Sequence, residues 1–314
     1  MESRQSWLNT VRQFNAGDML KHNAKYPMIP QRVIVMGAGG FIGASLISLL
    51  SKRDIPHLAL TSSKLNLLND NATKKLADII KPEDTLVVIA AIAPCKDNQM
   101  LLKNISIMAS VCAAIEKTPP KHVIYISSDA VYADDTKPLA ENSCAEPASV
   151  HGIMHLAREV MLKQVCNMRL AILRSTLVYG AGDTHNGYGP NQFYRFAVEG
   201  KSITLFGEGE EQRDHVHIED VIEIISLVIT HKSSGVLNVA TGVVKSFRDI
   251  AQAVATNFNP PIIIETTPRK GLMPHGGYRP FDITACRNAF PNFSYLPLEE
   301  GLKRMDYKIV GKAK

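Results

Sequence analysis

Short runs of apolar residues alternate along the chain with longer stretches in which apolar residues recur every three or four positions. The short runs predict buried strands at 33–36, 58–61, 85–90, 122–127 and 169–173. The longer stretches predict helices near 42–53, 71–80, 99–116 and 151–166. Strands and helices that alternate at these lengths form right-handed βαβ units. We therefore predict an α/β fold with a parallel sheet covered by helices on both faces.

Three glycines, Gly37, Gly40 and Gly43, follow the first predicted strand and open a helix. A backbone without Cβ atoms can approach a phosphate closely, and a helix N-terminus offers free N–H groups and the positive end of its dipole. The spacing is G-x-x-G-x-x-G, with Ile42 where G-x-G-x-x-G would have its last glycine. Because a strand precedes the turn and a helix follows it, we predict a dinucleotide site. Its predicted cofactor-binding residues are Gly37, Gly40, Phe41, Ile42, Gly43 and, at the end of the third predicted strand, Ala90.

The end of the second predicted strand bears on the choice of dinucleotide. Thr61, Ser62, Ser63 and Lys64 follow this strand, and no carboxylate is among them. An acidic residue there would hold the ribose 2′-OH of NAD, whereas hydroxyls and an ammonium group suit the 2′-phosphate of NADP. We predict that these four residues bind the cofactor and that NADP is preferred, with NAD possible.

The distribution of glycine and proline predicts two structural units. Both residues become frequent after Gly180, although one more apolar run, 235–240, predicts a further strand of the sheet. We predict a doubly wound, Rossmann-type dinucleotide-binding domain (31–176 and 213–240) and a smaller α/β substrate-binding lobe (177–212 and 241–314). Residues 1–30 are polar and predict an extension with one short helix around Trp7 to Phe14.

Composition excludes several classes of protein. The 314 residues are 45% hydrophobic and carry a formal net charge of +5, with no dense run of lysine and arginine, so nucleic acid is not expected as a partner. The five cysteines lack C-x-x-C spacing, which indicates reduced thiols. No apolar run reaches the length of a membrane span, and charges lie where a signal peptide would be apolar. We predict a soluble cytoplasmic protein without a membrane partner.

Hydroxyls and a carboxylate, Ser127, Ser128 and Asp129, end the fourth predicted strand and would face the ligand crevice. Together with further motifs, these residues resemble the extended short-chain dehydrogenase/reductase family, which includes nucleotide-sugar epimerases, dehydratases and ketoreductases. The resemblance covers about residues 32 to 305. The matching motifs are the glycine turn at 37–43, the helix asparagine Asn104, Ser-Ser-x-x-Val-Tyr at 127–132, Arg-x-x-x-Val-Tyr-Gly at 174–180, Gly-x-Gly at 207–209 and Arg-Asp-x-Val-His-x-x-Asp-Val at 213–221.

One departure from the family changes the predicted chemistry. The family uses Tyr-x-x-x-Lys at the start of a helix, where the tyrosine exchanges a proton with the substrate and the lysine holds the nicotinamide ribose. Gly152 and Glu159 keep the register of this motif, so His151 occupies the tyrosine position and His155 the lysine position. The resemblance thus assigns His151 and His155 to catalysis, and His155 also to cofactor binding.

Three hypotheses for the two histidines stay open. In the first, His151 is the acid/base, because imidazole titrates near pH 6.5 without help from a neighbouring ammonium group. In the second, the protein binds a dinucleotide and a nucleotide sugar without turnover. In the third, His151 and His155 lie one helical turn apart and bind a metal, although zinc would need at least one more ligand.

Ser128 and Asp129 narrow the reaction type. The resemblance gives Ser128 the catalytic hydroxyl, which would hold a sugar oxygen while its proton moves. Sugar 4,6-dehydratases of the family carry Thr-Asp-Glu here, and this chain has Ser128-Asp129-Ala130. Without the glutamate, dehydration is disfavoured. Asp129 is left as a proton donor or as a cap of its loop.

The second lobe is predicted to bind the nucleotide part of a substrate. Arg213 is expected to bind a pyrophosphate, because a guanidinium group matches phosphate oxygens bidentately. The resemblance supports this and suggests Arg279 as a second clamp. Asn191 would cap a helix or contact the nucleotide. His215 and His217 alternate on a strand and are expected to shape the sheet rather than bind metal.

These observations predict an NAD(P)-dependent epimerase or 4-keto reductase of a nucleoside-diphosphate sugar. The alternatives are a non-catalytic NAD(P)- and nucleotide-sugar-binding protein and a metal-dependent enzyme that uses the two histidines. The helices 99–116 and 151–166 are apolar on more than one face, and in the family they form a two-fold interface. We therefore predict a homodimer.

Overall fold

The computed structural model describes residues 19–166 and 169–305 of the chain. The helix predicted around Trp7 to Phe14 lies outside these residues. Within them, no helix combines the length and the apolar character needed to cross a bilayer.

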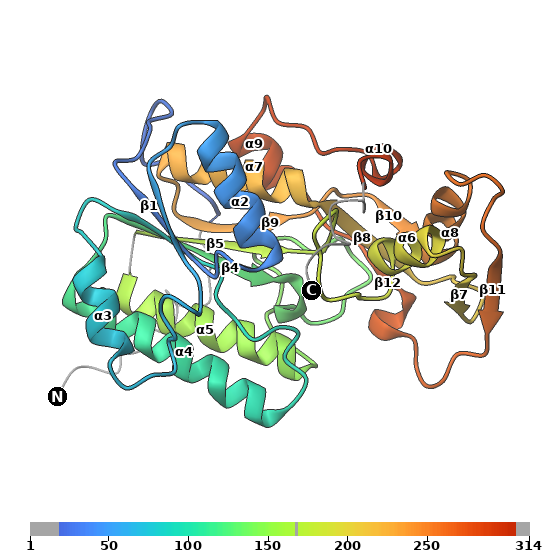
Figure 1. Cartoon of the computed structure of the whole chain (residues 1–314), viewed down its shortest axis with the longest axis horizontal. Helices are drawn as coiled ribbons and strands as arrows, with labels where there is room; N and C mark the ends of the chain where they lie inside the picture. The colour runs from blue at the N-terminus through green and yellow to red at the C-terminus, as the bar shows by residue number, and fades with distance from the viewer. Residues whose placement is uncertain (1–18, 167–168, 306–314) are drawn as a thin grey trace.

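A six-stranded sheet forms the body of the molecule (Figure 1). All of its strand pairs are parallel, and the order across the sheet is β2-β1-β3-β4-β5-β9. Its strands are β1 (Val33–Met36), β2 (His57–Leu60), β3 (Thr85–Val88), β4 (His122–Ser128), β5 (Leu170–Ser175) and β9 (Gly235–Val239). The predicted parallel α/β sheet is confirmed, including the strand expected at 235–240.

Helices cover both faces of this sheet because its central strands are apolar on both faces. Val33 and Val35 of β1 belong to one core, and Ile34 and Met36 belong to the other. One face is covered by α3 (Ala72–Ile79), α4 (Asn98–Lys117) and α5 (Val150–Cys166), and the opposite face by α2 (Phe41–Lys52), α7 (Ile218–His231) and α9 (Thr284–Ala289) (Figure 1).

The strand order reverses between β1 and β3. From β1 the chain passes to β2 on one side of the sheet and then returns to β3 on the other side. At such a reversal the loops that leave the carboxyl ends of the two strands diverge and leave a crevice for a ligand. The glycine turn after β1 and Ala90 after β3 lie at this point.

A second sheet and a helical layer make up the smaller end of the molecule (Figure 1). The sheet contains β6 (Leu177–Tyr179), β8 (Gln212–His217), β10 (Val244–Ser246) and β12 (Tyr278–Arg279). Beside it lie the pair β7 (Ile203–Phe206) and β11 (Ile264–Thr267) and the helices α6 (Pro190–Val198), α8 (Phe247–Ala255) and α10 (Leu298–Lys303). β8 pairs within this sheet, whereas the helix after it, α7, covers the six-stranded sheet. The proposed boundary at 213 therefore falls inside a strand of the second sheet, and the division into domains stays a prediction.

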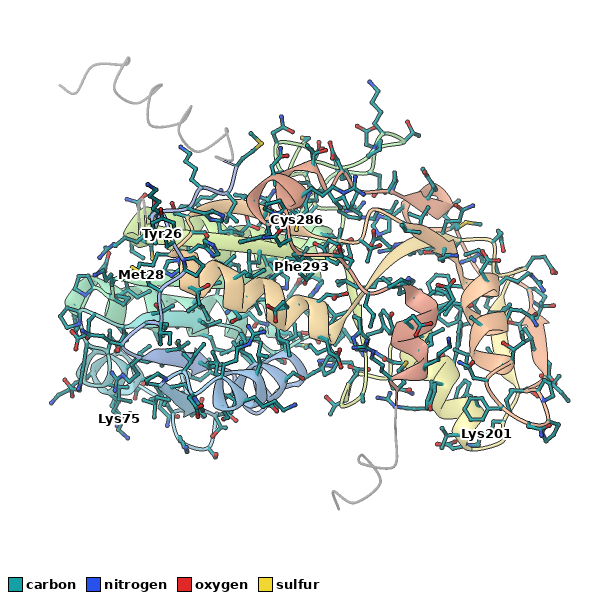
Figure 2. All side chains as sticks on the ribbon, turned by 90° about the horizontal axis from the view of Figure 1, so that it is seen from above. Tyr26, Met28, Lys75, Lys201, Cys286 and Phe293 are labelled. Carbon is teal, nitrogen blue, oxygen red and sulfur yellow. The ribbon has the colours of Figure 1, made fainter. Side chains whose placement is uncertain are left out.

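Part of the N-terminal extension covers the β9 edge of the large sheet. The N–H groups of Leu20 and Lys21 donate to the carbonyls of Val236 and Ser234 at 3.1 and 2.8 Å. The Nδ1 atom of His22 lies 2.8 Å from the hydroxyl of Ser233. Figure 2 shows Tyr26 and Met28 farther along this segment, at the same end of the molecule as Lys75 and far from Lys201. The segment thus pairs with backbone groups that an edge strand would otherwise expose.

Candidate active site

The turn after β1 has the shape needed for a dinucleotide phosphate. Gly37 has φ of +85°, and a Cβ atom on it would lie 2.7 Å from the nitrogen of Ala90. A Cβ atom on Gly43 would lie 2.1 Å from the carbonyl oxygen of Gly37. Gly40 is the N-cap of α2, with no side-chain cap and no acidic residue in the first turn that contains Phe41 and Ile42. The close backbone packing and the free N–H groups of α2 fit a diphosphate.

The polar residues after β2 lie beside this turn. The hydroxyls of Thr61 and Ser63 are 2.7 Å apart, and the ammonium group of Lys64 donates to the carbonyl of Ala59 at 3.2 Å. Ser62, Ser63 and Lys64 are exposed. Lys64 forms no salt bridge within the described part of the chain, so its charge is available to an anionic ligand.

The two histidines of α5 contact each other and are held by different partners. The rings of His151 and His155 meet edge to face, with centroids 4.7 Å apart. The backbone N–H of Cys95 donates to Nδ1 of His151 at 3.3 Å. Nδ1 of His155 lies 2.8 Å from the phenol oxygen of Tyr125 on β4. His155 is buried, whereas His151 is half-buried and closer to the surface of the site.

Burial lowers the pKa of both imidazoles. Desolvation lowers the pKa of His151, and the nearby charge of Asp129 opposes this shift in part. For His155, desolvation is again the main cause, and the charges of His151 and, to a smaller extent, Arg158 lower its pKa further, to well below the usual 6.5. Both residues are therefore neutral at pH 7.

Buried contacts fix α5 against β4. A Cβ atom on Gly152 would lie 2.0 Å from the carbonyl oxygen of Ala130, which is why this turn of the helix carries a glycine. The carboxylate of Glu159 accepts a hydrogen bond from the hydroxyl of Ser127 at 2.6 Å and pairs with Arg174 at 2.7 Å. Removing one partner of such a buried pair typically costs 3–5 kcal/mol. The position of His151 at the start of α5, near the charge of Asp129, thus depends on this interior network.

Ser128 ends β4, and Asp129 starts the short 3-10 helix η1 (Asp129–Val131). The hydroxyl of Ser128 accepts from the N–H of Ala130 at 3.2 Å and donates to the carboxylate of Asp129 at 3.3 Å. The other carboxylate oxygen of Asp129 accepts from Nε of Arg279 at 3.1 Å and lies 3.8 Å from Arg213. Asp129 is therefore the shared counter-ion of the two arginines.

The two arginines predicted to bind a diphosphate differ in exposure. Arg279 is 1% exposed, and besides Asp129 it donates to Asp134 at 2.7 Å and to the carbonyl of Tyr132 at 3.4 Å. Arg213 is less enclosed and pairs with Glu211 at 3.3 Å. A role for Arg279 in substrate binding stays a prediction, and it requires Asp129 or Asp134 to release this arginine.

Asn191 and the two histidines of β8 hold backbone in place. Asn191 lies inside α6 rather than at its N-cap, which is Gly189, and its carbonyl oxygen accepts from the N–H of Gly180 at 3.0 Å. His217 is the N-cap of α7 and accepts from the N–H of Glu219 at 3.3 Å. His215 is buried, and desolvation lowers its pKa to about 3. Among the described residues, no three side chains of His, Cys, Asp or Glu are grouped so that they could hold a metal ion.

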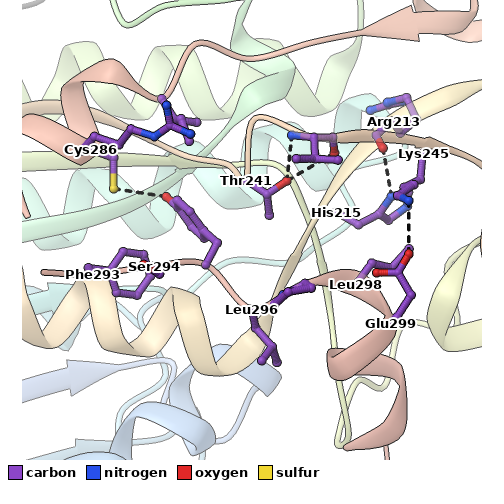
Figure 3. Close-up of a pocket in the computed structure, with 15 residues that line it drawn as sticks. Arg213, His215, Thr241, Lys245, Cys286, Phe293, Ser294, Leu296, Leu298 and Glu299 are labelled. Atoms are coloured by element: carbon purple, nitrogen blue, oxygen red, sulfur yellow. Dashed lines mark hydrogen bonds and ion pairs between the residues drawn. The ribbon is translucent and has the colours of Figure 1, made fainter. Parts of the chain in front are cut away.

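A cavity of about 420 Å³ lies beside β8 (Figure 3). Its wall includes Arg213 and His215, and Lys245 pairs with Glu299 at 3.1 Å along its edge. On the other side, the phenol of Tyr295 donates to the thiol of Cys286, as the dashed line in Figure 3 marks. The two histidines of α5 are not among the residues that line it, so this cavity is separate from the imidazole pair.

Comparison with known proteins identifies the family. The sequence matches the NAD dependent epimerase/dehydratase family over residues 33–240, which is more than half of the chain. The chain belongs to this family. The resemblance inferred from the motifs is thereby confirmed, and so is the prediction of an enzyme; the family is NAD dependent, and the predicted preference for NADP stays a prediction.

Individual relatives agree with this assignment. An ADP-L-glycero-D-manno-heptose-6-epimerase of Cupriavidus pinatubonensis is 25% identical over 87% of this chain and 96% of its own length. The UDP-glucose 4-epimerase of Thermotoga maritima, solved with UDP-glucose, has a TM-score of 0.74 at 22% identity and covers 87% of this chain and 97% of that chain. The UDP-glucose 4-epimerase of Thermus thermophilus, solved with NAD, has a TM-score of 0.75 at 19% identity and covers 90% of this chain and 100% of that chain. The two structures support the fold.

Sequence reasoning missed the partners of the two histidines, Tyr125, Arg158 and Cys95. The period of two along a strand offered a signal for Tyr125, because Tyr125 and Ser127 lie on one face of β4. They meet residues 155 and 159, which lie on one face of α5. Cys95 contacts His151 through its backbone, and this contact leaves no signal in the sequence.

Proposed function

We propose that this chain is an NAD(P)-dependent epimerase or 4-keto reductase of a nucleoside-diphosphate sugar, with an imidazole where the family has a phenol. The observation that carries the proposal is the pair His151 and His155, whose rings meet edge to face at the start of α5, with the charge of Asp129 near His151. The glycine turn after β1 and the family assignment support a dinucleotide in the adjoining crevice. We propose that the reaction takes place in the cytoplasm.

In this mechanism a bound nicotinamide cofactor supplies or accepts hydride. The hydroxyl of Ser128 positions the reacting sugar oxygen. Nε2 of His151 exchanges a proton with this sugar oxygen. The N–H of Cys95 donates to Nδ1 of the resting imidazole, so the resting proton lies on Nε2. Uptake of the substrate proton at Nε2 therefore requires Nδ1 to be protonated and the contact with Cys95 to open. In the resting state Nε2 of His151 is thus a hydrogen-bond donor. It can accept the substrate proton only after the hydrogen bond between Cys95 and Nδ1 is broken.

The substrate's diphosphate is assigned to Arg213 and Arg279, and its nucleoside to the region of Asn191. Both arginines share the counter-ion Asp129. An incoming diphosphate would replace carboxylate oxygens with phosphate oxygens and leave the guanidinium groups paired. Ala130, where dehydratases of the family carry glutamate, supports epimerisation or keto reduction over loss of water.

The decisive experiment combines calorimetry with a turnover assay. We expect the purified protein to bind NADPH and to convert at least one member of a panel of nucleoside-diphosphate sugars and their 4-keto forms. Loss of absorbance from the reduced nicotinamide would indicate a reductase, and conversion without net loss would indicate an epimerase. Binding of cofactor without any product would favour the non-catalytic alternative. Bound zinc in protein purified without a histidine tag would favour the metal-dependent one.

Lys64 is expected to decide between the two dinucleotides. Its exposed ammonium group donates to the carbonyl of Ala59 on β2, at the strand end where a 2′-phosphate would form a charge-assisted hydrogen bond. We expect Lys64→Glu to weaken NADPH binding by roughly 10- to 100-fold and to leave NADH binding within about threefold. Calorimetric titration of both nucleotides checks this. Lys75→Glu, an equal charge change on α3, is the matched control, and an unchanged preference in Lys64→Glu would contradict the assignment.

We further propose a homodimer built on α4 and α5. Leu102 of α4 is 66% exposed, and Ile153 and Val160 of α5 are 45% and 49% exposed. Ile153 and Val160 are seven residues apart and so share one face of the helix. We expect sedimentation of the wild type at micromolar concentration to give the mass of a dimer and Val160→Glu to give that of a monomer. Val198→Glu on α6, 53% exposed in the smaller lobe, should stay dimeric. A monomeric wild type would refute this interface.

A further inference from the structure

The surroundings of His155 determine which of its ring nitrogens carries the proton. Tyr125 is 1% exposed, and its phenol oxygen contacts Nδ1 of His155 at 2.8 Å. No other hydrogen bond of this phenol is formed within the described residues. If His155 donated to the phenol oxygen, the buried phenol hydrogen would be left without an acceptor, which costs the free energy of desolvating an unpaired donor. A phenol that donates to Nδ1 avoids this cost. The phenol therefore donates, Nδ1 accepts, and the imidazole proton lies on Nε2.

Arg158 adds a permanent charge next to this pair. Its side chain is fully buried, its Nη2 atom donates to the carbonyl of Ala90 at 2.6 Å, and its guanidinium carbon lies 5.2 Å from the centre of the Tyr125 ring. It pairs with no carboxylate in the described part of the chain, and its Nε atom is buried without a partner. A buried, uncompensated cation raises the free energy of a second positive charge nearby, so it opposes protonation of His155.

The remaining titratable neighbour of His155 is His151, whose ring meets it edge to face. The groups that face His155 are thus a protonated phenol from β4 and an arginine and a neutral imidazole from α5, and none of them is an anion that would favour imidazolium. Nε2 of His155 forms no hydrogen bond within the described residues. It is the ring nitrogen free to meet a ligand.

We propose that Tyr125 and Arg158 are positioning residues that hold His155 as the neutral imidazole with its proton on Nε2. His155 then contacts the ribose hydroxyls of the cofactor as a single uncharged donor, whereas the cation of the site is supplied by Arg158, three residues further along α5. The contact with ribose rests on the function proposed above. The fixed tautomer rests on the protein alone.

Nuclear magnetic resonance of the full-length protein with ¹⁵N-labelled histidine tests this without any cofactor. His155 is assigned from the signal lost in His155→Gln. We expect the wild type to show only the Nε2–H form of His155, unchanged between pH 8 and pH 6. In Tyr125→Phe, which removes only the hydroxyl, the Nδ1–H form should appear as a comparable population. Arg158→Met should move the titration midpoint of His155 upward, and Arg158→Lys should restore it. Tyr179→Phe, in the other lobe, is the matched control and should change nothing.

Binding of NADPH provides the second measurement. Loss of the fixed tautomer in Tyr125→Phe should raise the dissociation constant roughly twofold, because only about half of the molecules then carry the binding-competent tautomer. A wild-type His155 that is protonated on Nδ1, or that titrates near pH 6.5, would overturn the positioning role even if NADPH binds. A wild type that binds no pyridine nucleotide would overturn the ribose contact together with the proposed function, whatever the tautomer.

Discussion

Replacing His151 with phenylalanine is expected to lower kcat by roughly 10²- to 10⁴-fold while NADPH binding stays within about threefold. The range is the usual contribution of a positioned general acid or base. Phenylalanine keeps a ring against His155, which it meets edge to face at 4.7 Å, but it has no proton to exchange. Steady-state kinetics and calorimetry on the same preparation separate loss of chemistry from loss of binding.

A second variant distinguishes a proton carrier from a residue that only fills space. His151→Tyr restores the family's phenol without its lysine, so the phenol should keep a pKa near 10, and removal of the substrate proton by this variant should become faster as the pH rises toward 10. His57→Phe removes an imidazole from β2, on the edge of the sheet, and should leave kcat unchanged. Equal turnover in the wild type and His151→Phe would remove this imidazole from the mechanism.

The sequence predicted the large sheet well because burial on both faces leaves a strong signal. The run 33–36 coincides with β1, and 151–166 differs from α5 by one residue. The second sheet was not predicted strand by strand. β8 reads Gln-Arg-Asp-His-Val-His, yet four of its six residues are buried, because tertiary packing overrides its polar composition. Local pattern cannot reveal burial that is created by segments far away in the chain.

The candidate site was predictable to the extent that it follows from local motifs. The glycine turn and the substitution of both residues of Tyr-x-x-x-Lys are visible in the sequence. The hydrogen bond between Arg279 and Asp129 is not visible in the sequence, because 150 residues separate the two. For the same reason the contact that orients His155 comes from another element, β4, and could be found only once the fold had brought β4 and α5 together.

The stability of the fold is expected to decrease below pH 6.5 because several histidines are buried in neutral form. Burial lowers the pKa of His122, at the start of β4, to about 4. Its Nε2 atom lies 2.7 Å from the carbonyl of Ser233, and its Nδ1 atom is buried without a partner, so a proton there would have no acceptor. In the unfolded chain the same residue titrates near 6.5. As the pH falls, the unfolded state therefore takes up a proton on His122 that the folded state does not bind. This lowers the free energy of unfolding by about 2.5 kcal/mol between pH 7 and pH 4.5.

Comparison with His122→Gln isolates this effect from other titrations. Burial raises the pKa of Asp220 to about 6, so falling pH relieves its charge and offsets part of the loss in both proteins alike. Glutamine retains an N–H that can donate to Ser233 but does not titrate. We expect urea unfolding to give a free-energy difference between the two proteins that shifts by about 2.5 kcal/mol in favour of His122→Gln from pH 7 to pH 4.5. Burial lowers the pKa of His215 to about 3, so His215→Gln should give a similar shift. The two effects should add, because His215 lies in the other lobe and titrates independently of His122. Parallel pH profiles of wild type and variants would mean that these imidazoles are already solvated in the folded protein.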